Sequence, residues 1–263
     1  MGKTIGILSL KGGVGKTSSV IALGDAMANF GRKVLLVDGN FSAPNIGMHL
    51  NVLDSPVTLH HVLSRNAHIK DAIYKAGKFD VIPSSLSNKN PINVLDLRNQ
   101  IKLLKKRYDI ILIDSSPALN DETLAVMLAS DEILVITTPD IPSISTTMKA
   151  VKAARQRGTP ISGIIINKTH NKDFELSIED IEYASEVPVL AIIPYDISVQ
   201  KSLSQFIPST SHNPTSKSSE EYKKLAGILI GEKYNPFSLR NLFGMTPKRE
   251  EINREIFYRR VLG

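Results

Sequence analysis

A glycine-rich run near the N-terminus constrains the fold of this chain more than any other feature. Residues 11–17 read KGGVGKT, between a short apolar run, Thr4–Leu8, and a stretch with helical spacing, Thr17–Phe30. Glycines let the backbone wrap around oxygen atoms, and the N–H groups that begin the next helix point at phosphate. A strand, a glycine loop and a helix in this order predict a phosphate-binding loop, against the alternative of a structural turn.

The chemistry expected of this loop follows from its residue types. The Lys16 ammonium would reach the β- and γ-phosphates of a nucleotide, and the Thr17 hydroxyl would bind Mg²⁺. Backbone N–H groups would cradle the remaining phosphate oxygens. The residues expected to bind nucleotide here are Gly12, Gly13, Val14, Gly15, Lys16, Thr17 and Ser18.

The loop departs from the common pattern G-x-x-x-x-G-K-[ST], whose first glycine would fall at Leu10. The chain has Leu10-Lys11 there, and Lys11 is a second lysine that an ordinary loop of this kind does not need. This deviant Walker A loop resembles the MinD/ParA group of P-loop ATPases. The resemblance implies that Lys11 reaches across a nucleotide sandwich into the site of a partner subunit, and hence that ATP makes the protein form a homodimer.

Composition excludes several classes of protein. The chain has 263 residues, of which 42% are apolar, enough for one sizeable α/β domain. It has no cysteine, which excludes thiolate metal sites, thiol nucleophiles and the cysteine-bearing iron–sulfur carriers of the same family. The N-terminus leads directly into a strand without a signal peptide, and no stretch of about 18 apolar residues occurs. We therefore expect a cytoplasmic protein.

Short apolar runs alternate with amphipathic stretches along residues 1–231. The runs are continuously hydrophobic, as is typical of parallel strands buried on both faces. We expect an α/β fold, a mostly parallel twisted sheet of about seven or eight strands with helices on both faces. The resemblance implies that this fold is of the MinD-like P-loop NTPase type. The expected strands are Thr4–Leu8, Lys33–Val37, Phe79–Ile82, Ile110–Ile113, Glu132–Thr137, Ile161–Asn167 and Val189–Ile193. The expected helices are Thr17–Phe30, Ile92–Tyr108, Asn120–Ala129, Ile144–Gly158, Ser177–Ser185 and Ser218–Ile230, with a Ser/Thr/Pro-rich surface loop at Gln205–Ser219.

Two carboxylates end predicted strands. Asp114 follows the apolar run YDIILI, and a carboxylate at that position, aimed at the phosphate loop, is suited to holding Mg²⁺. Capping of a turn is the alternative. Asp38 ends the run KVLLV, and the family resemblance implies that it belongs to switch I and serves Mg²⁺.

Asn40 is the main departure from the family pattern. Relatives have Asp-x-Asp at this strand end, and their second aspartate positions or polarises the attacking water. An amide oxygen can accept a hydrogen bond from water, but it cannot take a proton. One hypothesis is therefore slow hydrolysis of ATP and a durable ATP-bound state. In the other, Asn40 only caps a turn and Asp38 or another group orients the water.

The predicted base-binding residues lie at the ends of the last two strands. The run IIINK ends in Asn167, whose amide can donate to and accept from the adenine edge at once. The resemblance implies that this asparagine contacts adenine. It also implies that the loop containing Pro194 and Asp196 packs on the base. A simple turn asparagine is the alternative for Asn167.

The last residues, 232–263, form a basic tail with apolar positions at helical spacing. Such a segment can lie in a membrane interface, and MinD relatives end in a short helix of this kind. Packing on the body, docking of a protein partner and, less favoured, DNA binding are the alternatives. The net charge of +6 is compatible with nucleic acid and with acidic lipid.

The sequence thus predicts a slow ATPase that acts as a dimerising switch in the positioning or partitioning of cellular structures at the membrane, with ATP and Mg²⁺ as cofactors. An activator protein is expected to trigger hydrolysis. A ParA-like ATPase that partitions DNA is one alternative, and a nearly non-hydrolysing nucleotide sensor is another.

Overall fold

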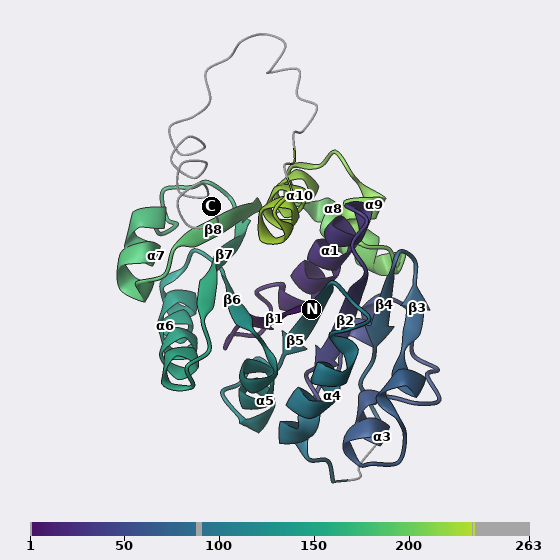
Figure 1. Cartoon of the computed structure of the whole chain (residues 1–263). Coiled ribbons are helices and arrows are strands. Elements are labelled where there is room, and N and C mark those ends of the chain that lie inside the picture. The colour runs from purple at the N-terminus through teal and green to yellow at the C-terminus, as the bar shows by residue number, and fades with distance from the viewer. Residues whose placement is uncertain (1, 88–90, 233, 235–263) are drawn as a thin grey trace.

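A single eight-stranded sheet forms the centre of the molecule (Figure 1). The structure is a computed structural model that describes residues 2–87, 91–232 and 234. The strand order is β3-β4-β2-β5-β1-β6-β7-β8, and paired strands are parallel except β3 and β4. The strands are β1 Lys3–Leu8, β2 Val34–Gly39, β3 Tyr74–Ala76, β4 Phe79–Ile82, β5 Ile110–Ser115, β6 Glu132–Thr137, β7 Ile161–Thr169 and β8 Val189–Pro194.

Helices cover both faces of the sheet (Figure 1). The longer helices are α1 Lys16–Asn29, α4 Leu97–Leu104, α5 Asp121–Ala129, α6 Ile141–Gln156, α7 Ile178–Ser185, α8 Ile197–Ser204 and α10 Lys217–Ile230. Shorter turns of helix are α2 Ile46–His49, α3 Leu59–Leu63 and α9 Ser209–His212, with 3₁₀ turns at Ile69–Ala72 and Val94–Asp96. Helices α1 and α10 pack on one face, whereas α3 to α7 pack on the other.

The hydrophobic strands explain this two-sided arrangement. Along β5, Ile111 and Ile113 join the cluster under α4 and α5, whereas Ile110 and Leu112 join the cluster under α1 and α10. Successive side chains of a strand point to opposite faces, so a strand that is apolar at every position needs cover on both sides. The predicted fold class is confirmed: the sheet is mostly parallel and has eight strands.

Several local expectations were wrong. The helices α2, α3 and α8 were not expected, and the expected helix Ile92–Tyr108 is shorter, since α4 runs from Leu97 to Leu104. The three-residue strand β3 was not expected, because its half-exposed sequence YKA carries no alternation long enough to register as a strand. Residues Gln205–Ser219 were expected as a surface loop, but they contain α9 and the buried Thr210. The Thr210 and Ser211 hydroxyls donate to Oδ2 of the buried Asp25 in α1, at 2.6 and 2.7 Å. Two hydroxyl groups of this segment thus donate hydrogen bonds to a buried carboxylate instead of facing solvent.

The parallel topology gathers the polar strand ends at one edge. Strand β1 leads into the glycine loop, β2 ends at Asp38 and Gly39, β5 at Asp114 and Ser115, and β7 carries Asn167. In the β2–β5 register Asp38 lies directly beside Asp114. In the β1–β5 register Asp114 pairs with Ile7, four residues before the loop begins at Lys11. Ligands of such sheets bind beyond this edge, at the carboxyl ends of the strands.

The body closes at the end of α10, which terminates at Gly231 with a left-handed φ of 74°. Just beyond it, Glu232 forms an ion pair with Arg32 at 2.7 Å, and the Tyr234 ring meets the Phe30 ring edge-on. The predictions for the tail, residues 232–263, otherwise fall on residues outside the described part of the chain. No helix within the described ranges is long and apolar enough to span a bilayer.

Candidate functional site

The glycine loop joins β1 to α1 at the centre of the sheet edge. Gly13 and Gly15 have φ values of 77° and 92°, a region that side chains disfavour. A Cβ on Gly15 would also lie 2.4 Å from Nδ2 of Asn167. Val14 is buried in the core and anchors the loop between the two glycines. None of the described side chains caps the N-terminus of α1, so its first N–H groups remain for a ligand.

The structure brings Lys16, Thr17 and Asp114 together. Asp114 is completely buried and Lys16 is only 8% exposed. Lys16 Nζ lies 2.8 Å from Asp114 Oδ1 and also donates to the Ser115 carbonyl, while Thr17 Oγ1 donates to Asp114 Oδ2 at 2.5 Å. Both oxygens of the carboxylate therefore face the loop, as a group that serves a metal bound there must.

Asp38 is buried beside Asp114 and organises the loop that follows β2. Its Oδ1 accepts the N–H of Asn40 at 3.2 Å, and its Oδ2 accepts the N–H groups of Asn45 and Ile46 at 2.8 and 2.9 Å. The pKa of Asp38 is raised to about 7, first because the carboxyl is buried and second because Asp114 lies close to it. A positive charge bound at this edge would favour the ionised form of Asp38.

Asn40 is 2% exposed, and its two amide atoms differ in their bonding. Nδ2 donates to the Ala43 carbonyl at 2.5 Å and so closes the turn after β2. Oδ1 is buried and has no hydrogen-bond partner among the described residues. A buried acceptor of this kind is costly unless something donates to it. The turn-capping and the water-binding hypotheses thus apply to different atoms of the same side chain.

The end of β7 holds the glycine loop in place. Asn167 Nδ2 donates to the Val14 carbonyl at 2.8 Å, and Lys168 Nζ donates to the Gly13 carbonyl at 2.7 Å. Lys168 adopts a φ of 60°, which turns the chain at this point. The structure thus places Asn167 against the loop, and its contact with a base stays a prediction. Sequence reasoning missed Lys168, although it directly follows Asn167.

Pro194 ends β8, and Asp196 caps α8. The Asp196 carboxylate accepts the Ser198 N–H at 2.8 Å on Oδ1 and the Ser218 hydroxyl at 2.7 Å on Oδ2. Partial burial raises the pKa of Asp196, but hydrogen bonds from Ser198, Ser218 and Ser216 outweigh this and lower it to about 2. The geometry gives Asp196 a structural task that links α8 to α10, and base contact by Pro194 and Asp196 stays a prediction.

We expect Asp196→Ala to lower the free energy of unfolding by about 1 to 2 kcal/mol at pH 7, because α8 loses its cap and Ser218 its acceptor. A lowered folded-state pKa stabilises the fold above the unfolded pKa of 3.8. That contribution is lost as the pH falls toward 2. The urea-unfolding difference from wild type should therefore shrink below pH 4, while Asp173→Ala, at an exposed carboxylate, should show no difference.

The contacts that Lys11 makes were not predicted from the sequence. Its Nζ donates to Asp140 Oδ1 at 2.9 Å and to Ser143 Oγ at 2.7 Å. Asp140 caps α6 through the Ser143 N–H and also accepts from the Thr138 hydroxyl. Burial raises the pKa of Asp140, but the hydrogen bonds from Thr138, Lys11 and Ser143 prevail and lower it to about 2. Lys11 is thus held within its own chain.

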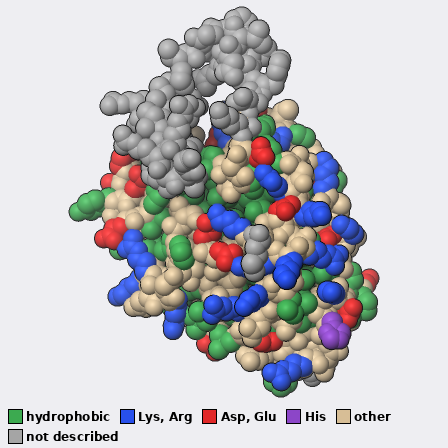
Figure 2. All heavy atoms as spheres, viewed as in Figure 1, with side chains coloured by type: hydrophobic (Ala, Val, Ile, Leu, Met, Phe, Trp, Pro, Cys, Tyr) green, Lys and Arg blue, Asp and Glu red, His purple; other side chains and the backbone are tan. Residues whose placement is uncertain are grey.

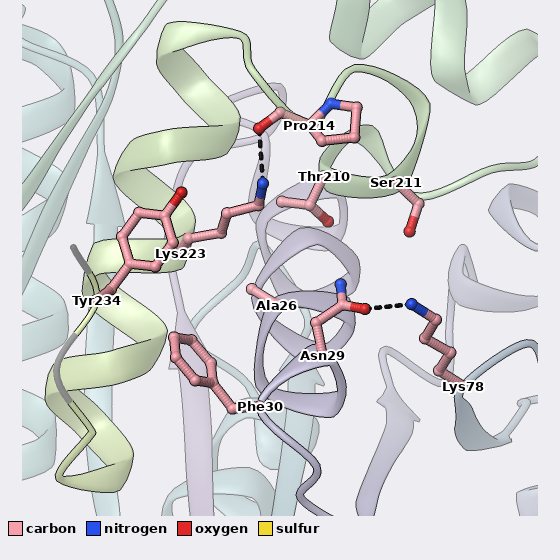
Figure 3. A pocket seen from close by; sticks show the side chains of 9 residues that line it. All are labelled: Ala26, Asn29, Phe30, Lys78, Thr210, Ser211, Pro214, Lys223 and Tyr234. Carbon is pink, nitrogen blue, oxygen red and sulfur yellow. Dashed lines mark hydrogen bonds between the residues drawn. The ribbon is translucent and has the colours of Figure 1, made fainter. Parts of the chain in front are cut away.

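A cavity of about 400 Å³ lies away from this edge, between the second half of α1 and the segment that contains α9 and α10 (Figure 3). Two lysines border it, and both are already bonded to the chain. Lys223 donates to the Pro214 carbonyl at 2.6 Å and Lys78 to the Asn29 side chain. The Thr210 and Ser211 hydroxyls in its wall are bonded to Asp25, and none of the predicted site residues lines the cavity.

Comparison with known proteins finds relatives over most of the chain. A model described as an AAA domain matches residues 2–161, and a model described as a NUBPL iron-transfer P-loop NTPase matches residues 94–230. An uncharacterized ATP-binding protein of Methanocaldococcus jannaschii is 34% identical, over 89% of this chain and 90% of its own. MinD of Thermotoga maritima is 29% identical, over 88% and 89%. The structure of Pyrococcus horikoshii MinD complexed with Mg-ADP superposes with a TM-score of 0.83 at 33% identity, covering 87% of this chain and 96% of that one.

The chain belongs to the MinD/ParA family of P-loop ATPases. One of the matching descriptions names iron transfer. The sequence contains no cysteine and therefore offers no thiolate ligand for iron. Family membership supports nucleotide and Mg²⁺ as ligands in general, since a MinD relative of one third identity is complexed with Mg-ADP.

Proposed function

We propose that this protein is an ATP-dependent dimerising switch that hydrolyses ATP slowly to ADP and phosphate. The observation that carries the proposal is the buried contact of Lys16 and Thr17 with Asp114 at the glycine loop, the loop whose first residue is Lys11. Phosphoryl transfer depends mainly on positioning and on stabilisation of charge. Positioning and charge stabilisation can both be supplied here, by the N–H donors of the loop, one buried lysine and the carboxylates at the strand ends.

The residues at the sheet edge fit Mg²⁺. A hydroxyl and carboxylates are the oxygen ligands this ion prefers, and in nucleotide sites it takes few protein ligands besides water and phosphate. Thr17 and Asp114 would hold the ion, with Asp38 in the adjacent register position. Once bound, Mg²⁺ would neutralise charge on the phosphates. Lys16 would then exchange its contact with Asp114 for the phosphates.

We expect Asn40→Asp to hydrolyse ATP at least about tenfold faster than wild type, because the new carboxylate can take a proton from the attacking water. The variant loses the Nδ2 bond to Ala43, so some loss of stability should accompany the gain. Turnover of Mg·ATP under saturating conditions measures the effect. An Asn40→Asp protein that is no faster than wild type would contradict the hypothesis that Asn40 makes hydrolysis slow.

The biological setting remains a proposal drawn from relatives named for septum-site determination. We propose a MinD-like role in positioning, with the ATP dimer peripheral at the inner face of the membrane and an activator protein that triggers hydrolysis. Weak anchors in two tails would add up in the dimer. On the face seen in Figure 2, Lys and Arg side chains are scattered among acidic ones. Co-sedimentation with anionic liposomes, set against DNA gel shifts, each with and without ATP, separates the MinD-like role from a ParA-like one.

Light scattering tests the switch itself. A monomer with ADP and a dimer with a non-hydrolysable ATP analogue are expected. A monomer under both conditions would contradict the dimerising switch. Turnover at background level, even with membrane present, would favour a nucleotide sensor.

A further inference from the structure

Glu122 is a buried carboxylate with an unused oxygen. It lies in the first turn of α5 and is only 8% exposed. Its Oε1 accepts both the N–H and the hydroxyl of Ser42, the former at 3.0 Å. Its Oε2 is buried without a hydrogen-bond partner, and no ion pair with Glu122 occurs among the described residues.

A structural clamp does not account for this arrangement. Holding Ser42 needs one acceptor oxygen, which a glutamine would supply without the cost of burying a charge. The N-terminus of α5 favours a negative charge, and the charge of Glu122 also interacts with His60, but neither gives Oε2 a hydrogen-bond donor. A buried acceptor without a donor among the described residues indicates a ligand or a functional proton.

The contacts around Glu122 lead directly to the nucleotide site. Ser42, which it holds, lies two residues after Asn40, whose own Oδ1 is also buried without a partner in the described part of the chain. On the other side, Thr123 Oγ1 donates to the Ser116 carbonyl at 3.2 Å, and the neighbouring Ser115 carbonyl accepts from Lys16. The two unsatisfied acceptors thus share one segment, the turn after β2: Asn40 is part of it, and Glu122 is bonded to it through Ser42.

We infer that Glu122 is the general base of ATP hydrolysis and supplies the charge that Asn40 lacks. The inference rests on the proposed function. Asn40 Oδ1 and Glu122 Oε2 would each accept a hydrogen bond from the attacking water. The water oxygen forms a bond to the γ-phosphorus, and the bond from that phosphorus to the β–γ bridging oxygen breaks. The water proton passes to the Glu122 carboxylate and is then released to solvent or phosphate, leaving ADP.

Glu122→Gln tests this role while keeping an acceptor for Ser42. Single-turnover cleavage of γ-labelled Mg·ATP should fall at least about tenfold, because a general base contributes at least that much. ATP affinity, measured by calorimetry, should stay within about twofold of wild type. Asp121→Asn is the matched control: it removes an exposed carboxylate from the same helical turn and should cleave ATP at the wild-type rate.

The Asn40→Asp background separates charge from structure. The tenfold gain expected of Asn40→Asp means that Asp at position 40 would be a far more effective base than Glu122, so Glu122→Gln should change cleavage there by less than about twofold. An equal tenfold loss in both backgrounds would reduce Glu122 to a clamp and overturn the inference. Wild-type cleavage by Glu122→Gln would overturn it too while leaving the proposed function intact. A wild-type protein that binds ATP and never cleaves it would contradict both.

Discussion

Lys16→Met is expected to lower the free energy of unfolding by about 3 to 5 kcal/mol in the absence of nucleotide, besides abolishing ATP binding. The stability loss arises because Asp114 is completely buried and Lys16 is its ion-pair partner. Methionine fills a similar volume but leaves the carboxylate without a cation. The Asp38 carboxyl in the adjacent register position makes the uncompensated charge still less favourable.

The double variant Lys16→Met/Asp114→Asn should recover much of this loss. Removing both charges leaves a neutral amide that Thr17 and neighbouring groups can satisfy, and replacing a whole buried pair is far less costly than breaking it. Chemical denaturation of the three proteins measures the difference. Lys149→Met, at an exposed position of α6, controls for the loss of a lysine as such. Equal stability of Lys16→Met and wild type would show that the buried pair carries no net stabilisation.

The sequence was sufficient to predict the mostly parallel sheet and the polar residues at the carboxyl ends of its strands. Continuous apolar runs such as IILI require cover on both faces, and parallel strands bring their carboxyl ends to one edge. Asp38, Asp114 and Asn167 could be placed near the loop for this reason alone. The periodicity argument fails for short elements, since β3 and α9 contain too few residues to show a period.

Contacts between residues far apart in the chain could not be predicted. Nothing in the local sequence around Asp140 connects it with Lys11, 129 positions away. The same holds for Glu122, which reads as an ordinary acidic residue in the first turn of a helix until its contact with Ser42 is seen. Such pairings are set by loop geometry, for which pattern and propensity carry no information.

Lys11→Ala is expected to weaken the ATP-dependent dimer by about 30-fold or more, as removal of a central interface cation should. The family resemblance assigns Lys11 to the partner's nucleotide site, yet here it bonds to Asp140 and Ser143 of its own chain. To reach a partner, Lys11 must give up these contacts. In the dimer, Lys11 would leave Asp140 and bind the phosphates of ATP, which carry more negative charge. Dimer formation would in this way depend on the bound nucleotide.

Asp140→Asn should act in the opposite direction. The amide keeps an acceptor for the Ser143 N–H that caps α6, but it no longer attracts Lys11 by charge. An exposed ion pair contributes up to about 1 kcal/mol, so the dimer should form at roughly two- to fivefold lower protein concentration. Analytical ultracentrifugation with a non-hydrolysable ATP analogue measures both variants, with Lys172→Ala as a control at an exposed lysine. If Lys11→Ala dimerises like wild type, the cross-dimer role is wrong and the contact with Asp140 is the whole function of Lys11.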